Sequence, residues 1–319
     1  MATIDSSTDR PGRGDNPGAL ARTVDATREF FVQMAQRPLA FAGMVIVFLF
    51  IILAAIGPAV APYSFREIIR ADDRRAIREV PPSLEFPFGT DDKGRDVFSR
   101  VLWGARDTIG LPAIATLISV AIGTVIGLAT GYAGGWVDEV VSRALDILLA
   151  IPALVLALVM LTTFVPVLNN SDSWLVETFG ATNISITLVI VLLYVPIVTR
   201  VIRSAVLNIR DSGFVEAARL RGEWSLYILF REIFPGVLPA LVVEASLRLS
   251  YAIFLVASLG FLGLGVQPPS PEWGTMVLDA RDKLATSPWA LWFPAGAIVL
   301  FIVSINLMSD GLRRVFRYE

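Results

Sequence analysis

Long runs without charged residues dominate the chain and alternate with shorter polar segments. A helix needs about 20 apolar residues to cross the hydrocarbon core of a bilayer. Five stretches without Asp, Glu, Lys or Arg exceed that length, and a sixth apolar stretch has only Glu244 and Arg248 as charged residues. We therefore predict an all-α polytopic membrane protein with six transmembrane helices. The six stretches are residues 38–65, 108–137, 147–171, 178–199, 233–264 and 284–309.

The first of these runs ends with a sequence like a secretory cleavage site, Ala59-Val60-Ala61. However, 37 residues of largely polar character precede the run, and a secretory signal has an apolar core of only about 7–15 residues. We therefore interpret 38–65 as an uncleaved first helix and 1–37 as an N-terminal tail. The polar composition of residues 1–27 is typical of disorder.

Basic residues are distributed unevenly among the segments that join the runs. With six spans, 1–37, 138–146, 200–232 and 310–319 share one side and hold 15 Lys and Arg, whereas the short segments opposite hold 2. The long segment 66–107 has nine acids against nine bases, and long loops inform orientation poorly. Because basic short loops stay in the cytoplasm, we predict that both termini are cytoplasmic and that 66–107 is an external loop.

Composition agrees with a membrane protein and excludes several kinds of chemistry. Hydrophobic residues make up 55% of the chain, charged residues 18%, and mean hydropathy is +0.65, whereas soluble domains are roughly 45–50% apolar and 25% charged. With no His and no Cys, disulfides, His or Cys metal sites and histidine-based triads are excluded. The net charge of −2 provides no footprint for nucleic acid. We predict no cofactor and no metal.

Two features inside the runs indicate packing or function. Small residues recur every four positions in the second run, which lets two helix backbones approach closely. Packing within the chain is one interpretation, and a subunit contact or a path-lining helix are the others. Glu244 and Arg248 share a helix face, and charges inside a bilayer usually face a bundle interior or a water-filled cavity. They are either a self-neutralising structural pair or part of a translocation path. The small residues are Ser119, Gly123, Gly127, Gly131 and Gly135.

The segment 200–235 is too long for a simple turn. Glu216, Ala217 and Ala218 favour a helix, and Gly222 ends or bends it. A second short amphipathic stretch follows from residue 224 to residue 230. We predict a helix–turn–helix on the cytoplasmic face whose apolar side fills a groove in a soluble partner.

This segment resembles the EAA loop of ABC importer permeases. Glu216-Ala217-Ala218 is followed after three residues by Gly222, and after ten more by Ile233-x-Pro235. The ten-residue spacing is similar to that of the dipeptide, oligopeptide and nickel branch. Arg221 and Phe234 depart mildly from the usual residues. Further blocks resembling the C-type permease of that branch are 88–100, 131–139, 261–269 and the residues Asn306, Asp310, Gly311, Leu312 and Arg313, so the resemblance covers about 28–317.

The resemblance implies a type I ABC importer permease in the plasma (inner) membrane, with a core five-helix domain over 108–319. Cytoplasmic ATP-binding subunits, a second permease subunit of different sequence and an external binding protein would be its partners. The solute would be a peptide or a similar small molecule, whose identity the sequence leaves open. The residues implied in ATPase coupling are Glu216, Ala217, Ala218, Gly222, Ile233 and Pro235.

The residues also limit the chain's own chemistry. The chain has two lysines, Lys93 and Lys283, and neither follows a glycine, so it has no phosphate-binding loop and is not predicted to be an enzyme. A secondary transporter without an ATPase partner is the alternative, but it needs coupling residues within the helices and often internal repeats. A membrane enzyme would have few residues from which to build a site.

Overall fold

The computed structural model describes residues 33–72 and 74–315, which fold almost entirely into helices. In this described part, two isolated β-bridges are the only β structure, so the all-α prediction is confirmed. The predicted tail over 1–37 lies almost wholly outside the described residues. The long helices are α2 (Pro38–Val60), α3 (Val97–Ala133), α7 (Ala181–Ile209), α10 (Phe234–Phe261) and α12 (Trp289–Val315). The shorter elements are α4 (Gly135–Leu149), α5 (Ala153–Asn169), α6 (Trp174–Phe179), α8 (Gly213–Leu220), α9 (Ser225–Tyr227), the π-helix η1 (Ile228–Ile233), α11 (Trp273–Ala280) and the 3₁₀-helix η2 (Arg281–Lys283).

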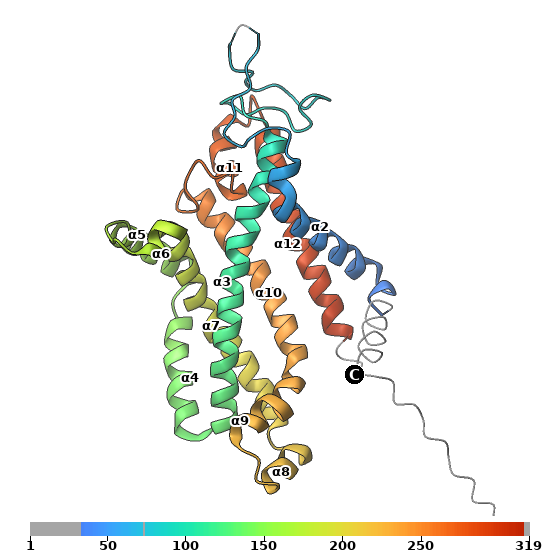
Figure 1. Cartoon of the computed structure of the whole chain (residues 1–319), viewed down its shortest axis with the longest axis vertical. Helices are drawn as coiled ribbons and strands as arrows, with labels where there is room; N and C mark the ends of the chain where they lie inside the picture. The colour runs from blue at the N-terminus through green and yellow to red at the C-terminus, as the bar shows by residue number, and fades with distance from the viewer. Residues whose placement is uncertain (1–32, 73, 316–319) are drawn as a thin grey trace, which may run out of the picture.

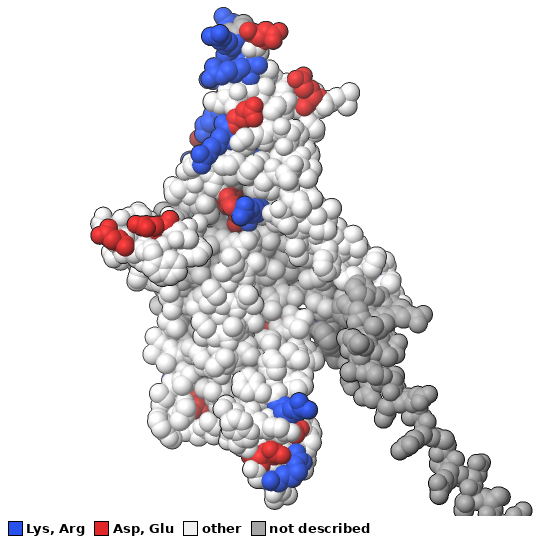
Figure 2. Space-filling model, in the orientation of Figure 1, with Lys and Arg blue, Asp and Glu red and all other residues white. Residues whose placement is uncertain are grey.

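Five helical segments are long and apolar enough to cross a membrane, and a sixth arises if α4 and α5 count as one bent span. Figure 1 shows the long helices as an elongated bundle, with α11 near its upper end and α8 at its lower end. Charged side chains gather mostly at these two ends, and a broad, largely uncharged surface lies between them (Figure 2). This distribution is what a bilayer requires of a spanning protein.

The third predicted span, 147–171, is not one helix, and that prediction was wrong. Helix α4 ends at Leu149, α5 begins at Ala153, and the two axes differ by 82°. Pro152 has an extended ψ of 130°. Proline has no N–H to donate and disfavours helical geometry in the residue before it, so the helix breaks here despite the continuous apolar sequence.

Other helix boundaries also differ from the predicted ones. Helix α3 begins at Val97, well before residue 108, because the Asp96 side chain accepts a hydrogen bond from the Ser99 N–H at 2.7 Å and caps the helix. Residues 138–146, predicted as a connection, lie inside α4. Helix α7 continues to Ile209, so the first residues of segment 200–235 extend a long helix.

The small residues of α3 pack against α7 within the chain. A Cβ added at Gly123 would lie 2.7 Å from the Val198 Cβ, and one at Gly131 would lie 2.8 Å from the Val206 Cβ. The Thr199 hydroxyl donates to the Gly123 carbonyl oxygen at 3.2 Å. The interpretation as internal packing is therefore confirmed for these positions. Gly135 does not continue the contact, because a Cβ there would have no neighbour within 4 Å.

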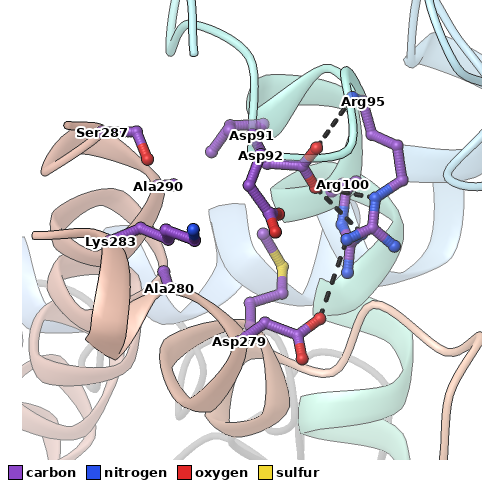
Figure 3. Close-up of a pocket in the computed structure, with 11 residues that line it drawn as sticks. Asp91, Asp92, Arg95, Arg100, Asp279, Ala280, Lys283, Ser287 and Ala290 are labelled. Carbon is purple, nitrogen blue, oxygen red and sulfur yellow. Dashed lines mark hydrogen bonds and ion pairs between the residues drawn. The ribbon is translucent and has the colours of Figure 1, made fainter. Parts of the chain in front are cut away.

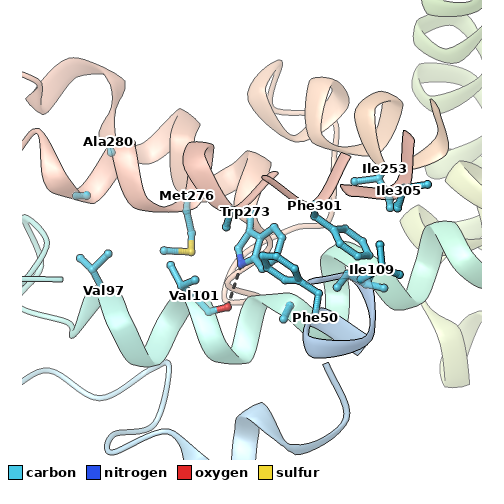
Figure 4. Packing of buried hydrophobic residues seen from close by; sticks show 14 residues of the cluster. Phe50, Val97, Val101, Ile109, Ile253, Trp273, Met276, Ala280, Phe301 and Ile305 are labelled. Carbon is cyan, nitrogen blue, oxygen red and sulfur yellow. Dashed lines mark hydrogen bonds between the residues drawn. The ribbon is translucent and has the colours of Figure 1, made fainter. Parts of the chain in front are cut away.

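A buried tryptophan joins four helices near the upper end (Figure 4). Trp273 of α11 is 1% exposed, and its indole N–H donates to the Val101 carbonyl of α3 at 2.9 Å. Its ring meets Phe50 of α2 edge-on at 5.7 Å, and Phe50 in turn contacts Phe301 of α12. This cluster holds the short helix α11 against the ends of the long ones.

The polar segment 61–96 is anchored to the bundle by Asp91 (Figure 3). The Asp91 carboxylate, itself buried, accepts from the Arg95 Nε at 2.7 Å and lies 3.4 Å from the Arg100 Nη1. Lys93 and Arg95 also reach Asp279 of α11, at 3.4 and 3.7 Å. These ion pairs connect the segment to both α3 and α11.

Candidate functional site

Helix α8 lies at the lower end of the molecule (Figure 1) and packs on an apolar cluster that it shares with α3, α7, η1 and α10. Val215 and Ala218 form its inner face and are fully buried. They belong to one apolar cluster with Ile228 and Ile233 of η1 and Val237 of α10. The cluster includes Val206 of α7 as well. Helix α8 is therefore packed against the lower ends of two long helices.

Gly222 ends α8 as predicted. Its φ of +77° is left-handed, a conformation that glycine adopts without steric cost. The Gly222 N–H donates to the Arg219 carbonyl at 2.9 Å, and the Glu223 N–H to the Ala218 carbonyl at 3.2 Å. This pair of bonds is the Schellman pattern that closes a helix C-terminus, and it turns the chain back towards η1.

The two residues that depart from the family pattern make contacts within the loop. Arg221 pairs with Glu232 of η1 at 3.4 Å and with Glu223 at 3.7 Å. Phe234 packs edge-on against Phe230 at 6.3 Å between ring centroids. Both contacts link parts of the loop to each other, so these departures are accommodated within the fold.

The outward face of the loop carries large apolar side chains, although it lies at a charged end of the molecule. Phe214 is 51% exposed, Leu220 84% and Trp224 66%, and exposed apolar patches commonly mark interaction sites. Phe214, Ala217 and Leu220 recur every three residues and so share one helix face. That spacing is the signal by which Phe214 and Leu220, missed in the sequence reasoning, could have been found.

The six residues implied in coupling fall into two groups. Glu216, Ala217, Gly222 and Pro235 are exposed on the loop. Ala218 and Ile233 are fully buried in the loop's own core. The side chains of these two residues are enclosed by the cluster around Ile228, so they do not lie on the exposed face of the loop.

Glu244 and Arg248 do come together on one face of α10. The Arg248 Nε lies 2.8 Å from the Glu244 Oε1, and both side chains are largely buried. The guanidinium carbon of Arg248 also lies 5.5 Å from the ring centroid of Tyr194 on α7 and 5.0 Å from that of Tyr251. Tyr194 is buried, whereas Tyr251 is 53% exposed. The pair is thus neutralised within the chain, with one exposed aromatic ring beside it.

No group of three or more His, Cys, Asp or Glu side chains converges as a metal site would within 33–72 and 74–315. The candidate site accordingly offers charge pairing, aromatic stacking and an apolar outer face. The exposed loop and the Glu244–Arg248 ion pair lie at different positions along the bundle. The exposed loop is at the lower end of α7 and α10, and the ion pair lies within α10.

Two family models match the chain. The model of the binding-protein-dependent transport system inner membrane component matches residues 123–317. The model of the N-terminal TM domain of oligopeptide transport permease C matches residues 26–82. Together they cover the described bundle except for residues 83–122, which include Asp91 and α3 up to the residue before Gly123.

Similar proteins of known function cover nearly the whole chain. A dipeptide transport system permease protein of Alkalihalophilus pseudofirmus is 36% identical over 290 residues, 91% of this chain and 89% of that protein. A di/tripeptide transport system permease protein of Pseudomonas aeruginosa is 34% identical, covering 90% of each chain. A glutathione transport system permease protein of Escherichia coli is 35% identical, covering 89% of this chain and 88% of that one.

The fold is also similar to that of a solved structure. An inward-facing structure of the MetNI methionine ABC transporter aligns with a TM-score of 0.53 and 20% sequence identity. The alignment covers 68% of this chain and 95% of the other. At this identity the likeness concerns the arrangement of helices alone.

Proposed function

This chain belongs to the family of binding-protein-dependent transport system inner membrane components, and from that premise we propose that it carries small peptides as one of two permease subunits in an ATP-driven importer. It is a membrane-spanning ABC transporter permease of the type I fold. The peptide cargo is proposed because the relatives are named as dipeptide, di/tripeptide and glutathione permeases. A binding protein on the outer side would deliver that cargo.

The observation that carries the coupling proposal is the exposed face of α8 over a buried core. Glu216 and Ala217 face outward beside Phe214 and Leu220, as a surface that seats in a groove of an ATP-binding subunit would. Glu216 would pair with a basic group on that subunit. The small Ala217 side chain allows the helix to approach closely.

Force on α8 would reach the membrane helices through the loop's core. Val215 and Ala218 are in the same cluster as residues of α7, η1 and α10, and packed interiors have low compressibility. Movement of α8 would therefore shift the lower ends of α7 and α10 together. In this mechanism Ala218 and Ile233 serve as positioning residues rather than as contacts to the partner.

The side of the membrane follows from the charge distribution. The excess of Lys and Arg in the segments predicted to share one side with 200–232, 15 against 2, favours a cytoplasmic α8 and cytoplasmic termini. The proposal is supported by α12, which runs towards the end of the molecule at which α8 lies (Figure 1). Glu244 and Arg248 would then lie beside the translocation path, with the exposed Tyr251 next to it.

Reconstitution of the assembled transporter in proteoliposomes tests this function. We expect ATP-driven uptake of a labelled dipeptide, and Glu216→Lys should reduce uptake and ATPase retention by about tenfold or more, the effect of losing a central interface contact. The control is Glu177→Lys, the same charge reversal on the exposed helix α6. Full uptake and a stable complex with Glu216→Lys would refute the coupling role, and uptake without ATP would refute the importer assignment.

A further inference from the structure

Segment 61–96, together with Pro269, forms a cleft at the end of the molecule opposite α8. One wall is a small hairpin in which Arg70 and Ala76 form an isolated antiparallel bridge. The hairpin is joined to the second wall, residues 92–95, by a hydrogen bond from the Ile69 N–H to the Gly94 carbonyl at 2.8 Å. The Glu79 N–H also donates to the Asp91 carbonyl at 3.1 Å. Because backbone hydrogen bonds connect both walls, the cleft is preformed.

The cleft has the size of a small-molecule site. Its volume is about 520 Å³, within the roughly 300–1,000 Å³ typical of ligand pockets. The side chain of Phe65 forms part of its apolar lining. A cavity of this volume accommodates a short peptide or a compact organic acid.

Its charge is strongly one-sided. Four basic side chains line the cleft against one acidic side chain, Asp92, and Figure 2 shows Lys and Arg gathered at this upper end. Two of the four are already engaged, because Arg95 binds Asp91 at 2.7 Å and Lys93 faces Asp279 at 3.4 Å. The four basic residues are Arg66, Arg78, Lys93 and Arg95.

The other two arginines have no acidic partner among the described residues. Arg66 stacks on the ring of Phe65 at 5.1 Å, and Arg78 forms no ion pair in the part of the chain that the structure describes. A guanidinium presents parallel N–H donors that match a carboxylate in bidentate geometry. The cleft is thus lined by two guanidinium groups without an acidic partner among the described residues, each suited to a carboxylate.

We propose that this cleft binds a small solute through its carboxylate, with Arg66 and Arg78 as the binding groups. The inference rests on the proposed function, since it takes segment 61–96 to be external and the solute to be peptide-like. The site would hold the carboxyl end of a peptide at the outer mouth, apart from Glu244 and Arg248. An acidic side chain of the delivery protein has the same chemistry, but the volume of about 520 Å³ is that of a small-molecule site, so the cleft is assigned to a small solute.

The test uses the assembled transporter in lipid nanodiscs, without the binding protein. Binding of Ala-Ala, N-acetyl-Ala-Ala and Ala-Ala amide is measured by saturation-transfer NMR. We expect the first two to bind and the amide, which lacks the carboxylate, to bind about tenfold more weakly. Arg66→Gln with Arg78→Gln should weaken Ala-Ala binding by about tenfold or more. The control Arg281→Gln removes an exposed arginine outside the cleft that pairs with its neighbour Asp282, and it should leave Ala-Ala binding unchanged.

Three other outcomes of these binding measurements would overturn the inference. Equal binding of Ala-Ala and its amide would overturn it, as would unchanged binding in the double variant. A double variant that binds Ala-Ala normally but no longer docks the binding protein would assign the cleft to that protein's acidic side chains and overturn the solute assignment. Uptake by the wild-type complex separates the two proposals. ATP-driven uptake of the dipeptide together with carboxylate-independent binding would overturn this inference alone, whereas absence of wild-type uptake would overturn the proposed function.

Discussion

Gly127 of α3 lies directly against Ile202 of α7, so closely that a Cβ added to Gly127 would be 2.8 Å from the Ile202 Cβ. The neighbouring pairs, Gly123 with Val198 and Gly131 with Val206, follow at the same four-residue step on both helices. The contact therefore runs along about two helical turns. Without bulk on α3, the branched side chains of α7 fill the space between the two backbones.

Gly127→Ala should destabilise the protein by about 1–3 kcal/mol, because the added methyl group overpacks a filled interface. Gly110→Ala is the matched control in the same helix, since a Cβ there meets nothing within 4 Å. That change should be neutral or stabilising by about 0.5–1 kcal/mol, as glycine is a poor helix former. Thermal unfolding of the purified protein in detergent measures both. Equal Tm values for the two variants would contradict the close packing.

Ala217→Trp and Ala218→Trp should fail in different ways, although the residues are adjacent. Ala218 is fully buried, so a tryptophan there should overpack the core beneath the loop. We expect the free energy of unfolding to fall by about 1–3 kcal/mol or more, with a lower Tm. Ala217 is exposed, so Ala217→Trp should keep a normal Tm yet lose the ATP-binding subunit. Comparing Tm with subunit retention on purification separates the two effects. A normal complex with Ala217→Trp would argue against α8 as the docking helix.

Gly222→Ala should cost about 1–2 kcal/mol of local stability, because a residue with a Cβ is strained at this left-handed φ. The end of α8 would loosen, and ATP-driven uptake should fall while membrane insertion persists. Gly213→Ala is the control on the same helix, where a Cβ has no neighbour within 4 Å and φ is not positive. Indistinguishable uptake by the two variants would show that the turn at Gly222 is not needed.

Removing one partner of the Glu244–Arg248 pair should harm the protein more than removing both. A single change, Glu244→Gln or Arg248→Gln, strands a buried charge at a cost of about 3–5 kcal/mol, whereas the double change removes both charges. The exposed pair Glu139–Arg143 has the same spacing and should contribute below about 1 kcal/mol. Tm and uptake of the two sets of variants decide the point. Additive losses at residues 244 and 248 would mean that they do not interact.

Stability should fall as pH rises through the titration of Glu272. This side chain is fully buried, and it caps α11 by accepting from the Gly274 and Thr275 N–H groups, each at 2.8 Å. Burial raises the pKa of Glu272 above its ordinary 4.5, although the two N–H groups act in the opposite direction. The folded state therefore binds more protons than the unfolded state between 4.5 and the raised pKa.

The stability that protonated Glu272 contributes to the folded state is fully present below the pKa of this group in the unfolded chain. It is lost as pH rises through the raised pKa of Glu272 in the folded state. Measuring Tm from about pH 5 to pH 8 in the wild type and in Glu272→Gln checks the sign, because the variant has no carboxyl group to titrate at this position. The wild type should lose more stability across this range. Parallel pH profiles would show that Glu272 does not contribute to the dependence.

Most of the helical architecture could be predicted from the sequence because it depends on local properties. Apolar runs of bilayer length located the long helices, and the four-residue spacing from Gly123 to Gly131 identified a face for close packing. Gly222 marked a turn because few other residues adopt its backbone conformation. The loop motif around Glu216 indicated the family because the spacing of its residues is also a local property, visible along the chain.

Only the tertiary structure decided which side chains these faces meet. The sequence placed Ala217 and Ala218 side by side, but the cluster formed with Ile228 and Val237 determines that Ala218 is enclosed and Ala217 is free. Likewise, Pro152 marked a place in the run over 147–171 where a helix can kink, but only the structure showed that the axes of α4 and α5 differ there by 82°. Periodicity specifies the residues that share a face, whereas the covering of that face depends on contacts between segments far apart in the chain, which no local pattern contains.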